Sequence, residues 1–474
     1  MTATTPTATF TRTLSDFAQA VEPSAVPEDV RHEVSRMVLD CAGCAVAGLI
    51  TDAGRIAVDL VRDERGPLQA QVVGAADASV MPAAFANTIL TNALDFDVYG
   101  PEGHIAPVVV SAALAMADAL DASGAELFAG LVAGLEVSGR IGGALRRPGM
   151  EGARQPSKVR GHGHVVFGAA AAAGRLLRLS ADQMHHAFGI AGYSATVPTL
   201  RKFFASADMP MTKYDHLGLM AQNGIQAALL AQRGFTGDLE VLEGDIGFWR
   251  FAGALGCDWE HLTRDIGSYW TINEVSYKPY PVGLYNGPAI HVARRLAQEN
   301  DLKPNEIEQV EIRTTRAEEA PAPAGVRHAL DAWHNAAFTL TAGLFDVRPF
   351  RSWQEPRSFQ RQDLLGFMER VRFSRLADEE LETKGNYWER WSPVRVSITA
   401  RGRTFEASSD YLPGLSDEEL AAKFHENTEG LLSPVDADQL VQRCWGLLGL
   451  GRSRDLTGLL SVQPGAPAVE TGEQ

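Results

Sequence analysis

The sequence contains little cysteine, and its first residues do not form a basic segment followed by an apolar one. The 474 residues include four cysteines (Cys41, Cys44, Cys257 and Cys444), too few for a disulfide framework in a chain of this length. Cys41 and Cys44 form a C-x-x-C inside the apolar run VLDCAGCAVAGL, a pattern typical of two small buried residues on one helix face. We therefore expect a cytoplasmic protein without a signal peptide and without a redox or zinc site at these thiols.

Long hydrophobic runs and excess positive charge are also absent. No stretch approaches the ~20 apolar residues that a membrane-spanning helix needs. The 43 lysines and arginines are outnumbered by 59 aspartates and glutamates, which gives a formal net charge of -16. Because such a surface repels phosphate backbones and anionic lipids, we expect neither nucleic-acid nor membrane partners.

Lysine is scarce, and several common catalytic motifs are missing. The chain lacks a G-x-S-x-G motif, a Rossmann glycine fingerprint and an H-E-x-x-H metal motif, and its FGAAAAAGRLL segment does not fit a phosphate-binding loop. Only seven of the 43 basic residues are lysines, so each lysine is a position worth inspecting. These are Lys158, Lys202, Lys213, Lys278, Lys303, Lys384 and Lys423.

The hydrophobic pattern changes along the chain. In the first half, apolar residues recur mostly at helical spacing, and alanine and glycine are crowded into several segments. Strand-like alternation begins after about residue 269, with VEIRTT at 310–315 and a hairpin of VRVSITA and RTFEASS at 394–409. After Pro413 the pattern is helical again, with acidic residues at the helix starts.

This pattern predicts a mostly α protein with a large helical domain that is discontinuous in sequence. The helical domain would span residues 1–268 and 413–474. A smaller α+β domain at 269–412 would be inserted between them, with helices at about 284–299 and 329–345.

The segment ALDFDVYGPEGHIAP carries the first candidate site. It places Asp95, Asp97 and His104 in a glycine-rich loop that opens onto a helix. The positive end of the helix dipole favours the neutral imidazole and attracts anionic substrate groups. Ordinary turn chemistry is the alternative, with Asp97 bonding its own backbone and His104 capping the helix.

A second loop, RGHGH, contributes His162 and His164. Their i, i+2 spacing would point both imidazoles the same way if the segment were extended. Two histidines without further ligands do not form a metal site, so we expect no bound metal.

Two lysines complete the set of candidate catalytic groups. Lys213 and His216 are three residues apart, just before a helical stretch that we expect to begin near Gly218, and Lys213 is suited to pairing with a carboxylate. Lys278 lies in SYKPYPVGLYNGP, where prolines stiffen the backbone. A carboxylate, several histidines and two lysines suit acid–base chemistry on an organic anion without a cofactor.

Five motifs, in this order, resemble those of the MmgE/PrpD family of 2-methylcitrate dehydratases and cis-aconitate decarboxylases. They are ALDFD followed by G-H and a proline-containing helix start, FGAAAAAGRLL, K-x-x-H-x-G with AQNG and RGFTG, KPYP, and AAKF. The similarity spans nearly the whole chain, and the order of the motifs makes it specific. It implies a discontinuous helical domain, an α+β lid domain, an active site between them and, commonly, a homodimer.

The resemblance also implies a chemistry. Family members dehydrate, decarboxylate or epimerise small polycarboxylates without metal or cofactor, by making or quenching negative charge on the carbon next to a carboxylate. The residues here that match the family's site positions are Asp95, His104, Lys213, His216 and Lys278. In the implied mechanism Asp95 or His104 shuttles the proton. Lys213 and Lys278 hold carboxylate and stabilise enolate-like charge.

The sequence departs from the family pattern at several polar positions. Val98 and Tyr99 replace the last acid and the hydroxyl residue of the usual D-F-D-D-T. RGHGH is a shortened form of the family's G-x-H-P-T segment, so either His162 or His164 could supply its histidine. In VGLYNG, Leu284, Asn286 and Gly287 stand where the family usually has a cation, a hydroxyl and an imidazole. Phe338 replaces a site tyrosine of decarboxylating relatives.

Each departure removes a partner for a substrate carboxylate, which would cost roughly a few kcal/mol per unpaired group. We therefore hypothesise that the substrate is larger and less charged than 2-methylcitrate and lies in a wider, more aromatic pocket. The lining residues would be Tyr99, Phe203, Phe204, Tyr280, Tyr285 and Trp333.

The sequence thus favours a cofactor-independent lyase of the dehydratase type, acting on a small organic anion or carbonyl compound. One alternative is an isomerase, epimerase or cyclase of a specialised biosynthetic pathway that keeps the fold and the acid–base groups. A second alternative, from a different class, is a catalytically inactive homologue that serves as a binding or scaffold partner.

Overall fold

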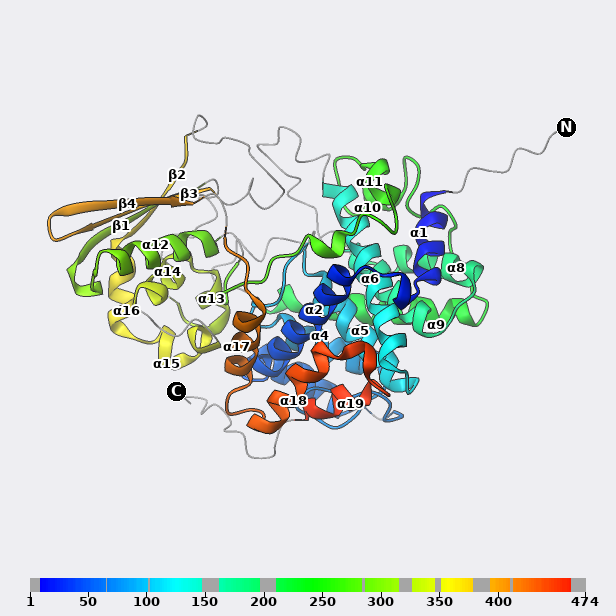
Figure 1. Ribbon diagram of the computed structural model, residues 1–474. Coiled ribbons are helices and arrows are strands. Elements are labelled where there is room, and N and C mark those ends of the chain that lie inside the picture. Colours follow the sequence, from blue (N-terminus) through cyan, green and yellow to red (C-terminus); the bar gives the residue numbers. More distant parts are fainter. Residues whose placement is uncertain are drawn as a thin grey trace.

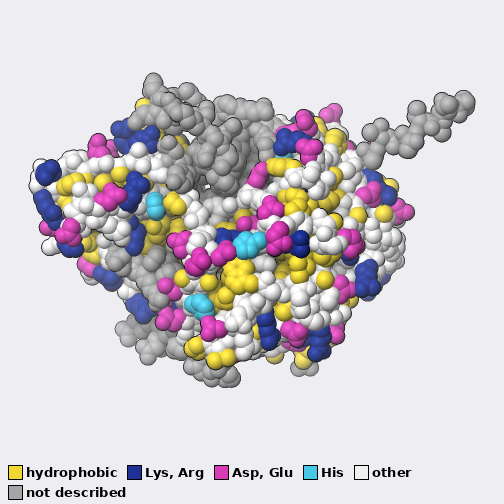
Figure 2. Space-filling view, viewed as in Figure 1, with side chains coloured by type: hydrophobic (Ala, Val, Ile, Leu, Met, Phe, Trp, Pro, Cys, Tyr) yellow, Lys and Arg dark blue, Asp and Glu magenta, His cyan; other side chains and the backbone are white. Residues whose placement is uncertain are grey.

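The protein has a large helical part and a smaller mixed part, which lie side by side in Figure 1. The computed structural model describes residues 9–64, 66–100, 103–146, 162–196, 210–283, 286–314, 326–345, 351–377, 393–409 and 412–461. The predicted mostly α class, with a small α+β insertion, is confirmed. Figure 2 shows acidic and basic side chains interspersed over both parts on the face in view.

The helical part begins near the N-terminus and includes most of the first half of the chain. Its longest helices, α2, α6 and α9, cross a core built mainly from alanine, valine and leucine. The elements are α1 (Phe10–Ala20), α2 (Glu28–Gly48), α3 (Asp52–Arg62), α4 (Val80–Asn92), α5 (Ile105–Ala119), α6 (Gly124–Arg146), α7 (Val165–Leu176), α8 (Ala181–Tyr193), α9 (Thr212–Gln232), α10 (Phe248–Phe251) and α11 (Trp259–Thr263).

Small residues allow the central helices to pack closely. A Cβ atom added to Gly168 of α7 would lie 2.6 Å from the Gly134 carbonyl oxygen of α6. A Cβ atom on Gly224 of α9 would lie 2.4 Å from the Cβ of Ala169. Larger side chains would force these helices apart, so the alanine- and glycine-rich segments set the spacing of the core.

Helix α6 is also long and apolar enough, by length and composition, to cross a membrane. Its whole apolar window, within Gly124–Leu145, is buried inside the protein, which is typical of a core helix.

The last part of the chain returns to the helical part. It forms α17 (Asp417–Thr428), α18 (Pro434–Trp445) and α19 (Arg454–Thr457). Helices α17 and α18 pack on α2, and the side chains of Leu420, Leu440 and Leu456 join the same core as Leu14 from α1. The predicted discontinuity of the helical part is therefore confirmed.

The mixed part has its own core around a four-stranded sheet of order β2-β1-β3-β4. Strand β1 pairs parallel with β2 and antiparallel with β3, and β3 and β4 form the predicted hairpin. At its turn Arg401 has φ 54° and Gly402 has φ 66°. The elements are α12 (Gly287–Glu299), β1 (Ile307–Thr314), α13 (Ala329–His334), α14 (Ala336–Leu344), α15 (Pro356–Phe359), α16 (Gln362–Phe367), β2 (Val371–Arg375), β3 (Val394–Ala400) and β4 (Arg403–Ser409).

The two cores meet near the segment that carries Lys278. The larger core includes Tyr277, and the smaller one begins with Tyr280. This connecting segment therefore lies where side chains of both parts converge. The domain limits at 268 and 412 stay predictions.

Candidate active site

The site is built on the loop between α4 and α5. Asp95 takes a left-handed backbone conformation, with φ 50°, which costs a non-glycine residue on the order of 1 kcal/mol. Just beyond it, Tyr99 pairs with Ser276 through two backbone hydrogen bonds of 3.0 and 2.8 Å. This bridge aligns the loop with the connecting segment and brings Lys278 to Asp95.

Two buried lysines, Lys213 and Lys278, converge on the Asp95 carboxylate, whereas the resemblance implied that they hold a substrate carboxylate. Lys213 Nζ donates to Oδ1 at 2.6 Å, and Lys278 Nζ lies 3.1 Å from Oδ2 and donates to the Asp95 carbonyl oxygen at 2.6 Å. The Asp95 side chain is 4% exposed. Although burial alone would raise it, the pKa of Asp95 is held well below its usual range by Lys213 and Lys278. Asp95 is therefore a weak base that remains ionised.

His104 stands at the N-cap position of α5, but its side chain forms a dyad with Asp97 instead of a capping hydrogen bond. Its Nδ1 lies 2.7 Å from Asp97 Oδ2, and the other Asp97 oxygen accepts from Asn92 Nδ2 at 2.7 Å. On its other side, His104 Nε2 lies 3.2 Å from Asp95 Oδ1. Asp97 thus bonds side chains across the loop rather than its own turn.

The surroundings of His104 favour its charged form, in contrast to the neutral form that the helix dipole alone would favour. Burial opposes the charged ring, but Asp97 and Asp95 outweigh it and raise the pKa of His104 above its ordinary value of 6.5. Two carboxylates in contact with the ring act more strongly than the helix dipole, which is equivalent to only about half a charge. Each ring nitrogen has a carboxylate oxygen within about hydrogen-bonding distance, and Nδ1 also lies 2.9 Å from Asn92 Nδ2.

Two further histidines lie against this dyad. The ring centroid of His162 lies 5.6 Å from that of His104 and 6.5 Å from that of His216. Gly103 has φ 136°, which strains any other residue, and a Cβ there would lie 3.2 Å from the His162 ring. His164 is buried and has helical backbone angles before α7, so the expected extended segment with parallel imidazoles was wrong. Of the two candidates, His162 is the one with a described ring contact to His104.

The start of α9 also differs from the expectation. The helix begins at Thr212 rather than near Gly218, so Lys213 and His216 lie in its first turns, on one face. Burial lowers the pKa of His216 to about 4 and lowers the pKa of Lys213. His216 is therefore a neutral group beside the charged cluster at neutral pH.

Aromatic rings surround the lysines. Lys213 Nζ lies 4.4 Å from the ring centroid of Trp333 and 4.7 Å from that of Tyr214, and Trp333 Nε1 donates to the Tyr214 hydroxyl at 3.0 Å. Tyr99 contacts His104 edge-on at 5.1 Å and lies 5.8 Å from Lys278 Nζ. Trp333 belongs to α13, so the mixed part contributes directly to this helical-domain site.

Asp95, Asp97 and His104 also satisfy a simple geometric test for metal ligation, because one potential ligand atom from each lies within 4.8 Å of the others. The two ammonium groups on Asp95 would repel a cation placed there. The charge arrangement therefore suits an anion better than a metal ion.

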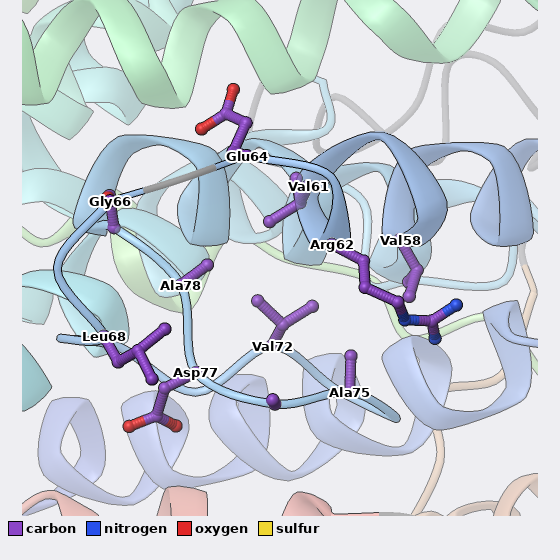
Figure 3. A pocket seen from close by; sticks show the side chains of 12 residues that line it. Val58, Val61, Arg62, Glu64, Gly66, Leu68, Val72, Ala75, Asp77 and Ala78 are labelled. Carbon is purple, nitrogen blue, oxygen red and sulfur yellow. The ribbon is translucent and has the colours of Figure 1, made fainter.

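A separate pocket lies between α3 and the chain around residues 66–79 (Figure 3). Its lining includes Val58, Val61 and Leu68 and none of the predicted site residues. One of its acidic residues, Asp77, pairs with Arg454 of α19 at 2.7 Å. We assign this pocket no part in the chemistry.

The comparison with known families agrees with the motifs. Residues 12–254 match the MmgE/PrpD N-terminal domain, and residues 280–447 match the MmgE/PrpD C-terminal domain. The chain belongs to the MmgE/PrpD family.

This MmgE/PrpD family member is similar to human cis-aconitate decarboxylase over nearly its full length. The two are 28% identical over 482 residues, which cover 96% of this chain and 95% of the human protein. The mouse cis-aconitate decarboxylase is 26% identical over 491 residues, covering 97% and 96%. A cis-aconitate decarboxylase-like protein, oryM, from Aspergillus oryzae is 30% identical over 260 residues, or 52% of each chain.

Three of the predicted substrate-binding residues lie in or near the smaller core. Tyr280 stacks on Trp353 with ring centroids 5.7 Å apart, and Phe338 is fully buried in the same core. Asn286 is buried at the start of α12, and its Nδ2 has no hydrogen-bond partner among the described residues. No described contact joins these three to Asp95. The predicted residues Tyr285, Phe203 and Phe204 lie outside the described residues.

Several residues that support this MmgE/PrpD site were missed by sequence reasoning. His334 follows Trp333, and burial lowers its pKa to about 4, while Asp95 and Lys213 act on it electrostatically. Asp40, Lys423 and Gln354 bond the loop that carries Asp95. A charged residue within an apolar helical run, as Asp40 is in VLDCAGC, was the signal that could have revealed one of them.

Proposed function

We propose that the protein is a lyase that makes or quenches negative charge on a carbon next to a carboxylate or carbonyl group. The observation that carries this proposal is the convergence of two buried ammonium groups on Asp95, beside the Asp97–His104 dyad. The full-length similarity to cis-aconitate decarboxylases supports a lyase. We also propose, from the resemblance, a cytoplasmic homodimer that uses no metal or cofactor.

His104 is the better candidate for the proton carrier. The pKa of Asp95 is strongly lowered by the lysines, whereas the pKa of His104 is raised by its carboxylate neighbours. His104 therefore holds a proton that it can deliver to a nearby carbanion. Asp97 would orient the ring through Nδ1 and stabilise its charge, as in other base–carboxylate pairs.

Lys213 and Lys278 would stabilise the charge that develops on the substrate. Lys213 bonds only Asp95 among the described residues, so N–H groups remain available for a substrate carboxylate or enolate oxygen. In a decarboxylating step, the carbon–carbon bond to the carboxylate breaks, carbon dioxide leaves and the electron pair stays on carbon. His104 then protonates that carbon. In a dehydrating step, the neutral form of His104 would take the α-proton and return it to the leaving hydroxide, which departs as water.

The substrate is proposed to be larger and less charged than 2-methylcitrate. Tyr99 and Trp333 place aromatic surfaces against His104 and Lys213, and the neutral Val98 occupies a position usually held by an acid in the family. Aromatic walls favour a substrate with apolar surface, since they offer no partner for an additional carboxylate.

The test is incubation in deuterated water with cis-aconitate, 2-methylcitrate and less charged carboxylate analogues, followed by NMR and mass spectrometry. Release of carbon dioxide or water from an analogue, with deuterium on the α-carbon, is the expected result. Substantial turnover of 2-methylcitrate or cis-aconitate would overturn the substrate proposal. Exchange with otherwise unchanged mass would instead identify an isomerase, and no exchange with any probe would favour the scaffold alternative.

Lysine variants test the charge-stabilising role with the same assay. Lys213→Ala and Lys278→Ala should each lower turnover at least tenfold, which corresponds to about 1.4 kcal/mol of lost transition-state stabilisation. Lys303→Ala is the matched control, because this lysine is exposed in the mixed part and pairs with Asp301 at 2.8 Å. Full activity in both site variants would remove the assigned role.

A further inference from the structure

The backbone of the Asp95 loop is held by side chains from four separate segments. The Leu94 carbonyl oxygen accepts from Gln354 Nε2 at 2.6 Å, and the Asp95 carbonyl oxygen accepts from Lys278. The Phe96 carbonyl oxygen accepts from Lys423 Nζ at 2.7 Å. These donors come from a short turn of the mixed part, the connecting segment and helix α17.

The fourth segment is α2, which contacts both the loop and α17 through Asp40. Asp40 of α2 accepts the Val98 N–H at 2.7 Å with one oxygen and binds Lys423 Nζ at 2.7 Å with the other. Lys423 Nζ also lies 3.9 Å from the ring centroid of Phe96. The pair therefore binds the loop backbone on both sides of Asp97, at the Phe96 carbonyl oxygen and at the Val98 N–H.

This ion pair is nearly sealed from solvent, with side-chain exposures of 4% for Lys423 and 0% for Asp40. Burial raises the pKa of Asp40 even though Lys423 opposes the shift. A buried pair of this kind often contributes no more stability than apolar residues of similar size. Its contacts with the loop fix the loop backbone. This matters because the left-handed conformation of Asp95 persists only where the surrounding structure holds it.

We propose that Lys423 and Asp40 are positioning residues, whose buried ion pair holds the 95–98 backbone so that the Asp95 and Asp97 carboxylates face His104. Neither residue touches the proposed reacting atoms. They act through the Phe96 carbonyl and the Val98 N–H. This inference rests on the proposed acid–base function, and it gives the helix that returns from the end of the chain a role in the reaction.

The test compares Lys423→Met, Asp40→Leu and the double variant in the full chain. Each single variant leaves one charge buried without its partner and should be less stable in urea. The double variant should recover most of that stability, because no unpaired charge remains. The Phe96 carbonyl and the Val98 N–H nevertheless stay without their partners, so the carboxylates should still be displaced.

The decisive readout is the titration of His104, followed by NMR in protein with carbon-13-labelled histidine and assigned with His104→Gln. The titratable groups beside this ring are Asp95, Asp97 and Tyr99 from its own loop, His162 from the loop before α7, and His216 from α9. Lys213 and Lys278 bind the Asp95 carboxylate. In the double variant, the midpoint should fall by at least half a pH unit. Turnover of any substrate found should fall at least tenfold, with KM changed less than threefold.

Asn427→Leu is the matched control, because Asn427 is buried on the same helix and contacts Cys44 rather than the loop. Its His104 titration should match that of the unmodified protein. A double variant with an unchanged His104 midpoint would show that the ion pair is only structural and would overturn the proposal. The NMR readout needs no substrate, so this result is distinct from a failure of the proposed reaction.

Discussion

Two buried clusters of charge in the helical part differ in how completely their groups are paired. On α6, Glu136 and Arg140 are both 0% exposed and lie 2.7 Å apart. The second Glu136 oxygen accepts from the Thr271 hydroxyl and the Ile272 N–H. The remaining Arg140 donors reach the carbonyl oxygens of three further residues. This cluster fastens a later segment to α6, and all three Arg140 nitrogens and both Glu136 oxygens are bonded.

The Asp95 cluster is arranged differently. Two lysines and a histidine converge on one carboxylate, and Lys213 bonds a single acceptor among the described residues. The buried Asn92 Oδ1 also has no partner there. A saturated cluster is suited to holding structure, whereas one with surplus cationic donors is suited to receiving an anion. Substitutions that remove a single charge from each cluster test this distinction.

The largest effect is expected from Asp95→Asn. Removing the charge leaves Lys213 and Lys278 without their common carboxylate and weakens the field that keeps His104 protonated. We expect turnover to fall about 10³-fold, within the range of general acid–base catalysis, because His104 would no longer hold the proton that it delivers. The measurement is kcat on any substrate found by the exchange assay. A fall in kcat of less than tenfold, in a variant with unchanged unfolding behaviour, would mean that the Asp95 charge has no part in the reaction.

Glu136→Gln should show the opposite pattern. It leaves Arg140 buried without a counter-charge, so the free energy of unfolding should fall by about 3 kcal/mol. Turnover per folded molecule should stay within about twofold, because Glu136 contacts none of the Asp95 cluster in the described residues. Urea unfolding and kcat measured on the same preparation separate the two effects. A tenfold fall in kcat at unchanged stability would mean that the Glu136 cluster contributes to the reaction and not to the fold.

Much of the fold was visible in the sequence. The β3–β4 hairpin and the return to helix after Pro413 follow from alternation, turn residues and capping, which are local signals. The start of α9 was misplaced, although Tyr214 and Leu217, three residues apart and both buried, already continue the apolar pattern of the helix before Gly218. Element starts are less strongly encoded than element interiors.

The site was only partly predictable. Motifs brought Asp95, His104, Lys213 and Lys278 into consideration, and the structure places all four in contact. The raised pKa of His104 was missed, because it depends on carboxylate distances that only the folded loop defines. Asp40, Gln354 and Lys423 were missed for a related reason, since they reach the loop from segments far apart in sequence.

The smallest expected effect concerns the pH dependence of stability. The pKa of His104 is raised from 6.5, so its contribution is present below 6.5 and is lost as pH rises through the higher folded value. The pKa of Asp97 is lowered from 3.8, so its contribution is present above 3.8 and is lost as pH falls. His104→Gln should therefore cost more stability at pH ~5.5 than at pH ~9, as measured by urea unfolding at both values.

The double variant Asp97→Asn with His104→Gln is the control for this prediction. Once Asp97 is neutral, the additional loss from His104→Gln should be smaller at pH ~5.5, since the ring then keeps only Asp95 as a carboxylate partner. Equal losses from His104→Gln at both pH values would mean that the imidazole is neutral in the folded protein. His104 could then accept a proton but could not deliver one, and the direction of proton transfer proposed for the Asp95 cluster would have to be reversed.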